Sequence, residues 1–267
     1  MLGTELRCAA LAAWRLRDPP AKAAAARALA SAALPLDSAA ELYADEPHAG
    51  HPERPHRVAP SGLPRRSVHT PEGHAALLHA VAHIEFNAIN LALDAVWRFS
   101  GLPEAFYRQW LQVAAEEALH FTLLTDHLAT LGRAYGDFDA HDGLWTMARK
   151  TAHDPLARMA LVPRTLEARG LDATPPMQDK LRAAGDTAAV EILDIILRDE
   201  IGHVAVGNRW FAWLCARDGV EPLATFERLR QDHGAPRLKP PFNLAARRRA
   251  GFTPEELLAL EQGATGR

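Results

Sequence analysis

Two short segments of the sequence each place a glutamate three residues before a histidine. In EEALHF these residues are Glu117 and His120, and in DEIGHV they are Glu200 and His203. Residues three apart in an α-helix share one face and lie about 4.5 Å apart along the axis. A carboxylate and an imidazole at that spacing can bind the same metal ion. The alternative is a buried salt-bridge network, because both helix faces are otherwise apolar.

Each of these pairs has a further carboxylate upstream at nearly the same distance. Glu85 lies 32 residues before Glu117, and Glu167 lies 33 residues before Glu200. Glu85 shares its helical face with apolar residues, where an unpaired charge would cost several kcal/mol or more. The chain therefore consists of two similar halves, each with a glutamate on one helix and Glu-x-x-His on the next.

The second half fits this scheme less smoothly than the first. A glycine and two prolines follow Glu167 closely and interrupt a regular helix. We therefore predict a kink at 170–175 and a continuation of the helix to residue 184. Glu191 and Asp194 are the alternatives to Glu167 as a ligand.

Helical signals dominate the segments that must position these residues, and strand signals are almost absent. Thr70 and Pro71 form a good helix start, with the threonine as N-cap and the proline at the first helical position. The predicted long helices cover 70–99, about 103–131, a broken region that ends at Glu167, and about 187–217. Four long helices around one core predict an all-α protein and a four-helix bundle.

The regions outside the bundle differ from it in composition. Residues 1–69 are predicted to form two short alanine-rich helices followed by an irregular wrapping segment rich in proline, histidine and arginine. The bundle itself covers 70–218. Residues 219–267 form a C-terminal extension packed on the bundle, with a closing helix that starts at Thr253.

At these motifs the sequence resembles the ferritin-like superfamily, which includes ribonucleotide reductase small subunits, bacterial multicomponent monooxygenases and rubrerythrin. More narrowly, HIEFNAI, EEALHF, EARGLD and DEIGHV, with the KPPFN tail, resemble a bacterial ferritin-like family whose function is not established. The resemblance covers roughly residues 65–255. It implies a ferritin-like four-helix bundle in which two metal ions are ligated by Glu85, Glu117, His120, Glu167, Glu200 and His203. It also implies that Glu116 and Asp199 hydrogen-bond to a ligand histidine and fix its ring.

This ligand set favours a particular cofactor and reaction class. Four carboxylates and two imidazoles suit two iron ions, a manganese–iron pair or two manganese ions. We expect an oxidase or hydroxylase that uses O₂ or a peroxide on a small-molecule substrate, with an external electron donor because no flavin or nicotinamide motif is present. The alternatives are metal storage or detoxification of ferritin type, and a di-iron tRNA-modifying hydroxylase. The sequence does not assign catalytic residues.

Composition limits the partners and the location of the protein. The net charge of −3 does not favour nucleic-acid binding, and Arg247, Arg248 and Arg249 are expected to form a solvated face. Cys8 and Cys215 do not form a disulfide framework, which favours a reducing compartment. No stretch approaches the roughly 20 apolar residues of a membrane span. We expect a cytoplasmic monomer or small homo-oligomer without membrane contact.

His79 and His83 lie one helical turn apart beside Glu85. They are candidates for a further metal site. We favour either a hydrogen-bonding role for them or a place at the rim of the main site.

Overall fold

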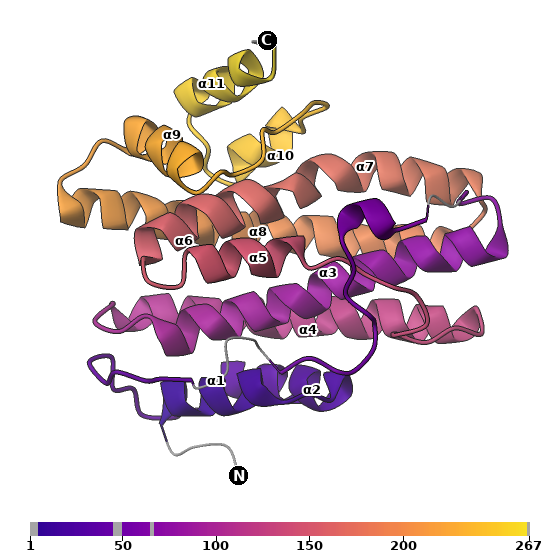
Figure 1. The fold of residues 1–267 in the computed structure, drawn as a ribbon, viewed down its shortest axis with the longest axis horizontal. Helices are drawn as coiled ribbons and strands as arrows, with labels where there is room; N and C mark the ends of the chain where they lie inside the picture. The colour runs from indigo at the N-terminus through magenta and orange to yellow at the C-terminus, as the bar shows by residue number, and fades with distance from the viewer. Residues whose placement is uncertain (1–4, 45–49, 65–66, 266–267) are drawn as a thin grey trace. The chain divides into compact units, whose positions relative to one another are not determined.

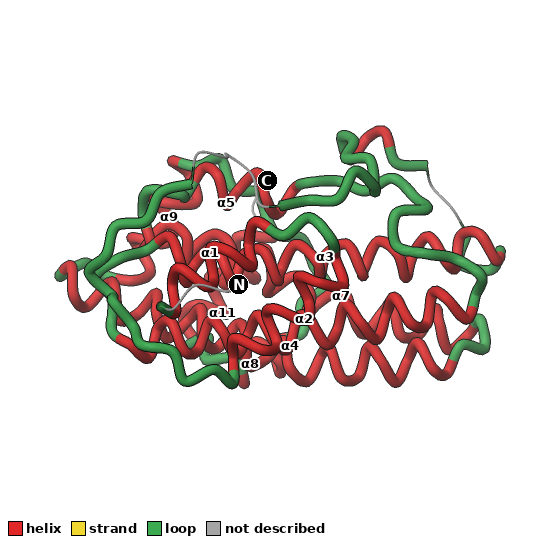
Figure 2. Tube along the Cα trace, turned by 90° about the horizontal axis from the view of Figure 1, so that it is seen from below, coloured by secondary structure: helices red, strands yellow, loops and turns green. Residues whose placement is uncertain are grey.

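The computed structural model describes residues 5–44, 50–64 and 67–265, so parts of the predicted wrapping segment (45–49 and 65–66) and both chain ends lie outside the described residues. Within these ranges the chain consists of helices and loops, and no strand is assigned (Figure 2). The all-α prediction is confirmed. The ferritin-like four-helix bundle stays a prediction.

The helices, in chain order, are α1 (Leu6–Arg15), α2 (Pro19–Ala30), η1 (Pro60–Gly62), α3 (Pro71–Arg98), α4 (Glu104–Thr130), α5 (Gly143–Lys150), α6 (Pro155–Leu161), the π-helical η2 (Val162–Glu167), α7 (Ala168–Ala183), α8 (Thr187–Asp218), α9 (Pro222–Asp232), α10 (Leu244–Arg249) and α11 (Pro254–Thr265).

The chain divides into two compact units. The first contains residues 1–145 and 184–192, and the second contains residues 146–183 and 193–267. We describe each unit by itself. The three-part division made from the sequence stays a prediction.

The first unit is organised by the hairpin of α3 and α4, which lie side by side along their lengths (Figure 1). α3 begins as predicted, because the Thr70 hydroxyl accepts a hydrogen bond from the Gly73 amide at 3.1 Å. The hairpin turns at Gly101, whose φ of 71° lies in the left-handed region that favours glycine. Both helices end within about a residue of their predicted limits.

The two N-terminal helices pack on this hairpin, α1 against α3 and α2 against α4 (Figure 1). Buried cations hold them there. The Arg7 guanidinium donates to the carbonyls of Val96 and Trp97, at the C-terminal end of α3 where carbonyls lack helical partners. The Lys22 ammonium donates to the carbonyl of Trp14 at 2.9 Å and to the side-chain oxygen of Asn90. The predicted N-terminal helices thus contribute to the core of the unit.

α3 is long and apolar enough to pass a composition test for a membrane span. However, 78% of its most apolar 18-residue window is buried inside the protein. Such burial is typical of the core helix of a soluble protein.

The second unit bears on the predicted break after Glu167. α7 runs through both Pro175 and Pro176 to Ala183, so the predicted continuation of the helix to residue 184 is confirmed to within a residue, and the kink at 170–175 stays a prediction. A proline leaves the carbonyl four residues earlier without its helical donor. The side chain of Asn243, from the KPPFN segment, donates to that carbonyl on Leu171 at 3.2 Å. The irregular segment lies earlier, in the π-helical turn that ends at Glu167.

The C-terminal helices of the second unit share its core with α7 and α8. α10 packs on α7 and α11, and α9 packs on α6 (Figure 1). The apolar cluster among them consists of Ala168, Leu171, Val204, Ala246, Ala250, Phe252 and Leu257. α11 starts as predicted: the Glu256 amide donates to the Thr253 hydroxyl, and the Thr253 amide donates to the Glu256 carboxylate. The sequence did not predict α9 or α10, whereas α5 and α6 fall in the region predicted as a broken helix.

The basic run of α10 is not entirely a solvated face. Arg248 and Arg249 are exposed as expected, but Arg247 is 1% exposed. Its guanidinium forms a buried salt bridge with Asp172 of α7, at 2.7 and 3.0 Å. The prediction is wrong for Arg247 because the apolar face of α10 turns that residue toward α7.

Replacing Gly207 with alanine tests the packing of the π-helical turn. A Cβ at Gly207 would lie 2.5 Å from the Cβ of Pro163, and a proline ring cannot move aside easily. We expect Gly207→Ala to reduce the free energy of unfolding by roughly 1–3 kcal/mol. Gly202→Ala in the same helix is the control, since a Cβ there meets nothing within 4 Å, and it should gain roughly 0.5–1 kcal/mol. Denaturant unfolding measures both variants, and equal midpoints would contradict the close packing of Gly207 against Pro163.

Candidate metal centre

Three of the predicted ligands lie together in the core of the first unit. Glu85 comes from α3, and Glu117 and His120 come from α4; all three are at most 3% exposed. His120 Nδ1 lies 3.1 Å from Glu85 Oε2 and 3.4 Å from Glu117 Oε2. The ligand atoms of the three residues all lie within 4.8 Å of one another. The hairpin brings them level, as the spacing of 32 residues requires.

This cluster favours positive charge. Burial by itself lowers the pKa of His120, but the hydrogen bonds and charges of Glu117 and Glu85 outweigh it and raise that pKa to about 11. Without a metal, the imidazole is therefore held in its protonated form between two carboxylates. A metal cation can take the place of that proton, and two oxygen ligands with one nitrogen ligand suit iron or manganese.

The second unit contains the matching motif on α8. Glu200 and His203 are 7% and 0% exposed, and His203 Nδ1 lies 3.7 Å from Glu200 Oε1. Glu167 belongs to the same unit, where it is half-buried at the last residue of the π-helical turn. A π-helical turn contains an extra residue and is frequent at functional sites, because it re-aims the side chains that follow. The alternatives Glu191 and Asp194 are both exposed, and Asp194 accepts a hydrogen bond from Gln178 at 2.6 Å.

The two acids expected to orient the histidines are half-buried. Gln112 donates to Glu116 at 2.7 Å, and Arg198 forms an ion pair with Asp199 at 2.8 Å. Their role toward His120 and His203 stays a prediction, as does metal binding by the six ligand residues.

Comparison with known proteins gives the family of the chain. A family described as "Protein of unknown function (DUF455)" matches residues 15–258. The chain belongs to this family. It is also 52% identical over 231 residues to an uncharacterized protein of Haemophilus influenzae (strain ATCC 51907 / DSM 11121 / KW20 / Rd), which covers 84% of this chain and 80% of that protein. No solved structure matches the chain. The range matched to the DUF455 family includes all six predicted ligands.

The DUF455 chain contains a buried polar network on α3 that the sequence predicted only in part. His79 accepts a hydrogen bond from the Gly136 amide at 2.9 Å, and His83 Nδ1 lies 2.9 Å from the hydroxyl of Tyr135. Their expected hydrogen-bonding role is confirmed. Asn87, which was missed, hydrogen-bonds to His83 at 3.0 Å, and its spacing of four residues from His83 was the available signal. Burial lowers the pKa of His83 to about 3 and that of His79 to about 4, so both rings are neutral.

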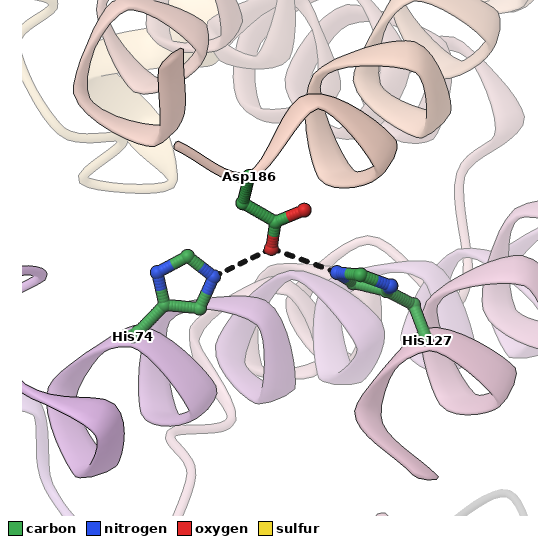
Figure 3. Close-up of side chains that lie close together, drawn as sticks. All are labelled: His74, His127 and Asp186. Carbon is green, nitrogen blue, oxygen red and sulfur yellow. Dashed lines mark hydrogen bonds and ion pairs between the residues drawn. The ribbon is translucent and has the colours of Figure 1, made fainter. Parts of the chain in front are cut away.

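A second cluster, missed in the sequence, joins three helix ends of the first unit. The Asp186 carboxylate accepts hydrogen bonds from His74 at 2.6 Å and from His127 at 2.8 Å (Figure 3). Its other oxygen accepts from the Ala189 amide at 2.8 Å and caps α8. The three side chains thus hold the start of α3, the end of α4 and the start of α8 together. We interpret this cluster as a structural tie, because hydrogen bonds involve both oxygens of the carboxylate.

The structural tie predicts a pH-dependent contribution to stability. Burial raises the pKa of Asp186, but hydrogen bonds from His127, the Ala189 amide and His74 lower it below the ordinary value of about 3.8. The stabilisation is therefore fully present at pH values well above the ordinary pKa and is lost as the pH falls through the lowered pKa. Asp186→Asn keeps a capping side chain but removes the charge, and we expect a loss of roughly 1–3 kcal/mol at pH 7.

Thermal unfolding between pH 7 and pH 3 measures this contribution. The difference between wild type and Asp186→Asn should shrink as the pH falls. Asp179→Asn is the control, because its side chain is 76% exposed in an ion pair with Arg182. A constant difference across the pH range would argue against the tie.

Proposed function

We propose that this DUF455 protein is a di-metal oxidase or hydroxylase that uses O₂ or a peroxide on a small-molecule substrate. Its two metal ions are iron, manganese or one of each. The observation that carries the proposal is the burial of two glutamates beside one histidine in the α3–α4 hairpin. The ligands are Glu85, Glu117, His120, Glu167, Glu200 and His203.

The chemistry of the donor groups supports this choice of metal. Carboxylates and imidazoles without a thiolate suit iron and manganese, and the same motif on α8 supplies ligands for a second ion. Burial of two carboxylates in an apolar core is expensive unless cations compensate their charge. When bound, two such ions supply the redox chemistry for reducing O₂ or a peroxide.

The burial of the hairpin ligands supports a reaction that must exclude water, and buried aromatic rings lie next to them in the sequence. Phe86 and Phe121 neighbour Glu85 and His120 along their helices, and their ring centroids lie 5.5 Å apart. The ring of Tyr135 packs against both phenylalanines, at 5.6 and 5.0 Å. Because Glu85, Glu117 and His120 are at most 3% exposed, reactive species formed beside them are kept from water. The reducing electrons come from an external donor in this proposal.

Metal analysis tests the proposal. Wild-type protein from iron-supplemented cells should contain about two metal ions per chain, as expected for six ligands of this kind. Glu117→Ala and His203→Ala should lose most of that metal while keeping their helical circular dichroism. Glu104→Ala in the same helix as Glu117 is the control, since its side chain is 63% exposed in an ion pair with Arg108. If metal analysis finds no bound metal in the wild-type protein from iron-supplemented cells, the proposal is overturned.

The mass of the native particle separates this function from ferritin-type storage. A small oligomer or monomer that takes up no more than about two iron ions per chain is expected here. A large closed shell that accumulates many iron ions per chain would support storage instead.

A further inference from the structure

The second unit contains a pocket of about 500 Å³ that the proposed metal chemistry does not use. Its walls come from the π-helical turn, from α9 and from α11, with Phe252 just before α11. Small-molecule sites in proteins typically have volumes of about 300–1,000 Å³. The pocket is therefore large enough for an organic ligand.

Arg164 is the most unusual residue in the wall of this pocket. It is 4% exposed, and its guanidinium lies within 4.8 to 5.1 Å of the ring centroids of Phe211, Phe226 and Phe252. It donates to Asn208 at 2.9 Å and forms an ion pair with Glu256. Among the residues that the structure describes, its buried Nε has no hydrogen-bond partner. A buried donor without an acceptor costs roughly 1–3 kcal/mol, so an acceptor from a ligand would be stabilising here.

The charges around the pocket select the kind of ligand. Its lining contains four arginines against two glutamates, which gives a positive formal charge; the arginines are Arg164, Arg230, Arg237 and Arg247. Guanidinium groups bind carboxylates well because their planar N–H donors match the two carboxylate oxygens. The remaining wall is mainly apolar, with Phe226, Phe252 and Leu260 among its residues.

We propose that this pocket binds an organic monocarboxylate with an apolar chain or ring. The carboxylate lies at the arginines, where it accepts from Arg164 Nε, and the apolar part packs against the phenylalanines and Leu260. Binding of this ligand does not require a metal. The proposal therefore stands or falls separately from the proposed oxidase function.

Isothermal titration of metal-free, full-length protein with decanoate tests the site. We expect saturable binding of one decanoate per chain, with a Kd below about 1 mM. Decanol has the same chain without the charge and should bind at least tenfold more weakly. No saturable heat with decanoate, or equal affinities for decanoate and decanol, would overturn the proposal.

Two variants locate the binding in this pocket. Arg164→Gln should weaken decanoate binding at least tenfold. If that variant fails to fold, Ala259→Trp serves in its place, because Ala259 is an exposed residue at the pocket wall and the indole would fill the space. Arg228→Gln on α9 is the control, since Arg228 pairs with Asp232 outside the lining. Unchanged affinity in a folded Arg164→Gln or Ala259→Trp variant would refute the site.

Discussion

The structure depends on one constraint, which is that charged side chains buried in a helical core need compensating partners. Glu85, Glu117 and His120 are nearly inaccessible to water, yet they carry groups that are strongly solvated in an unfolded chain. The His120 imidazole lies between the two carboxylates, 3.1 Å from that of Glu85 and 3.4 Å from that of Glu117. The packing of α3 against α4 thus brings together a buried group of two carboxylates and one imidazole, whose donor atoms suit a metal ion.

The same constraint explains features of the second unit. Arg247 and Asp172 are buried and satisfy each other through two hydrogen bonds, and the Asn243 side chain satisfies a carbonyl that Pro175 leaves without a donor. These contacts hold the C-terminal helices on α7. Arg164 differs, because its aromatic cage and its partners leave one N–H without an acceptor within the described part of the chain. That difference separates a structural buried arginine from one suited to a ligand.

Much of the local structure could be predicted from single segments. The Thr70 cap, the Gly101 turn and the Thr253 capping box each depend on residues a few positions apart, and the structure confirms all three. The Glu-x-x-His motifs could be found for the same reason. The polar face of α3 was read only in part, because the significance of Asn87 depends on its contact with His83 and with His51 of the preceding loop.

The helical class, the long helices and the three residues of the α3–α4 cluster follow from the sequence, because helical periodicity and capping are local properties. The tertiary structure shows what the sequence did not, namely that the donor to the Leu171 carbonyl comes from Asn243, 72 residues away. It likewise decided the tie between His74 and Asp186, which are 112 residues apart. Long-range partners of this kind change the energy of a proline, an arginine or a histidine by several kcal/mol. A local sequence pattern contains no information about which distant residue will contact these side chains in the folded protein.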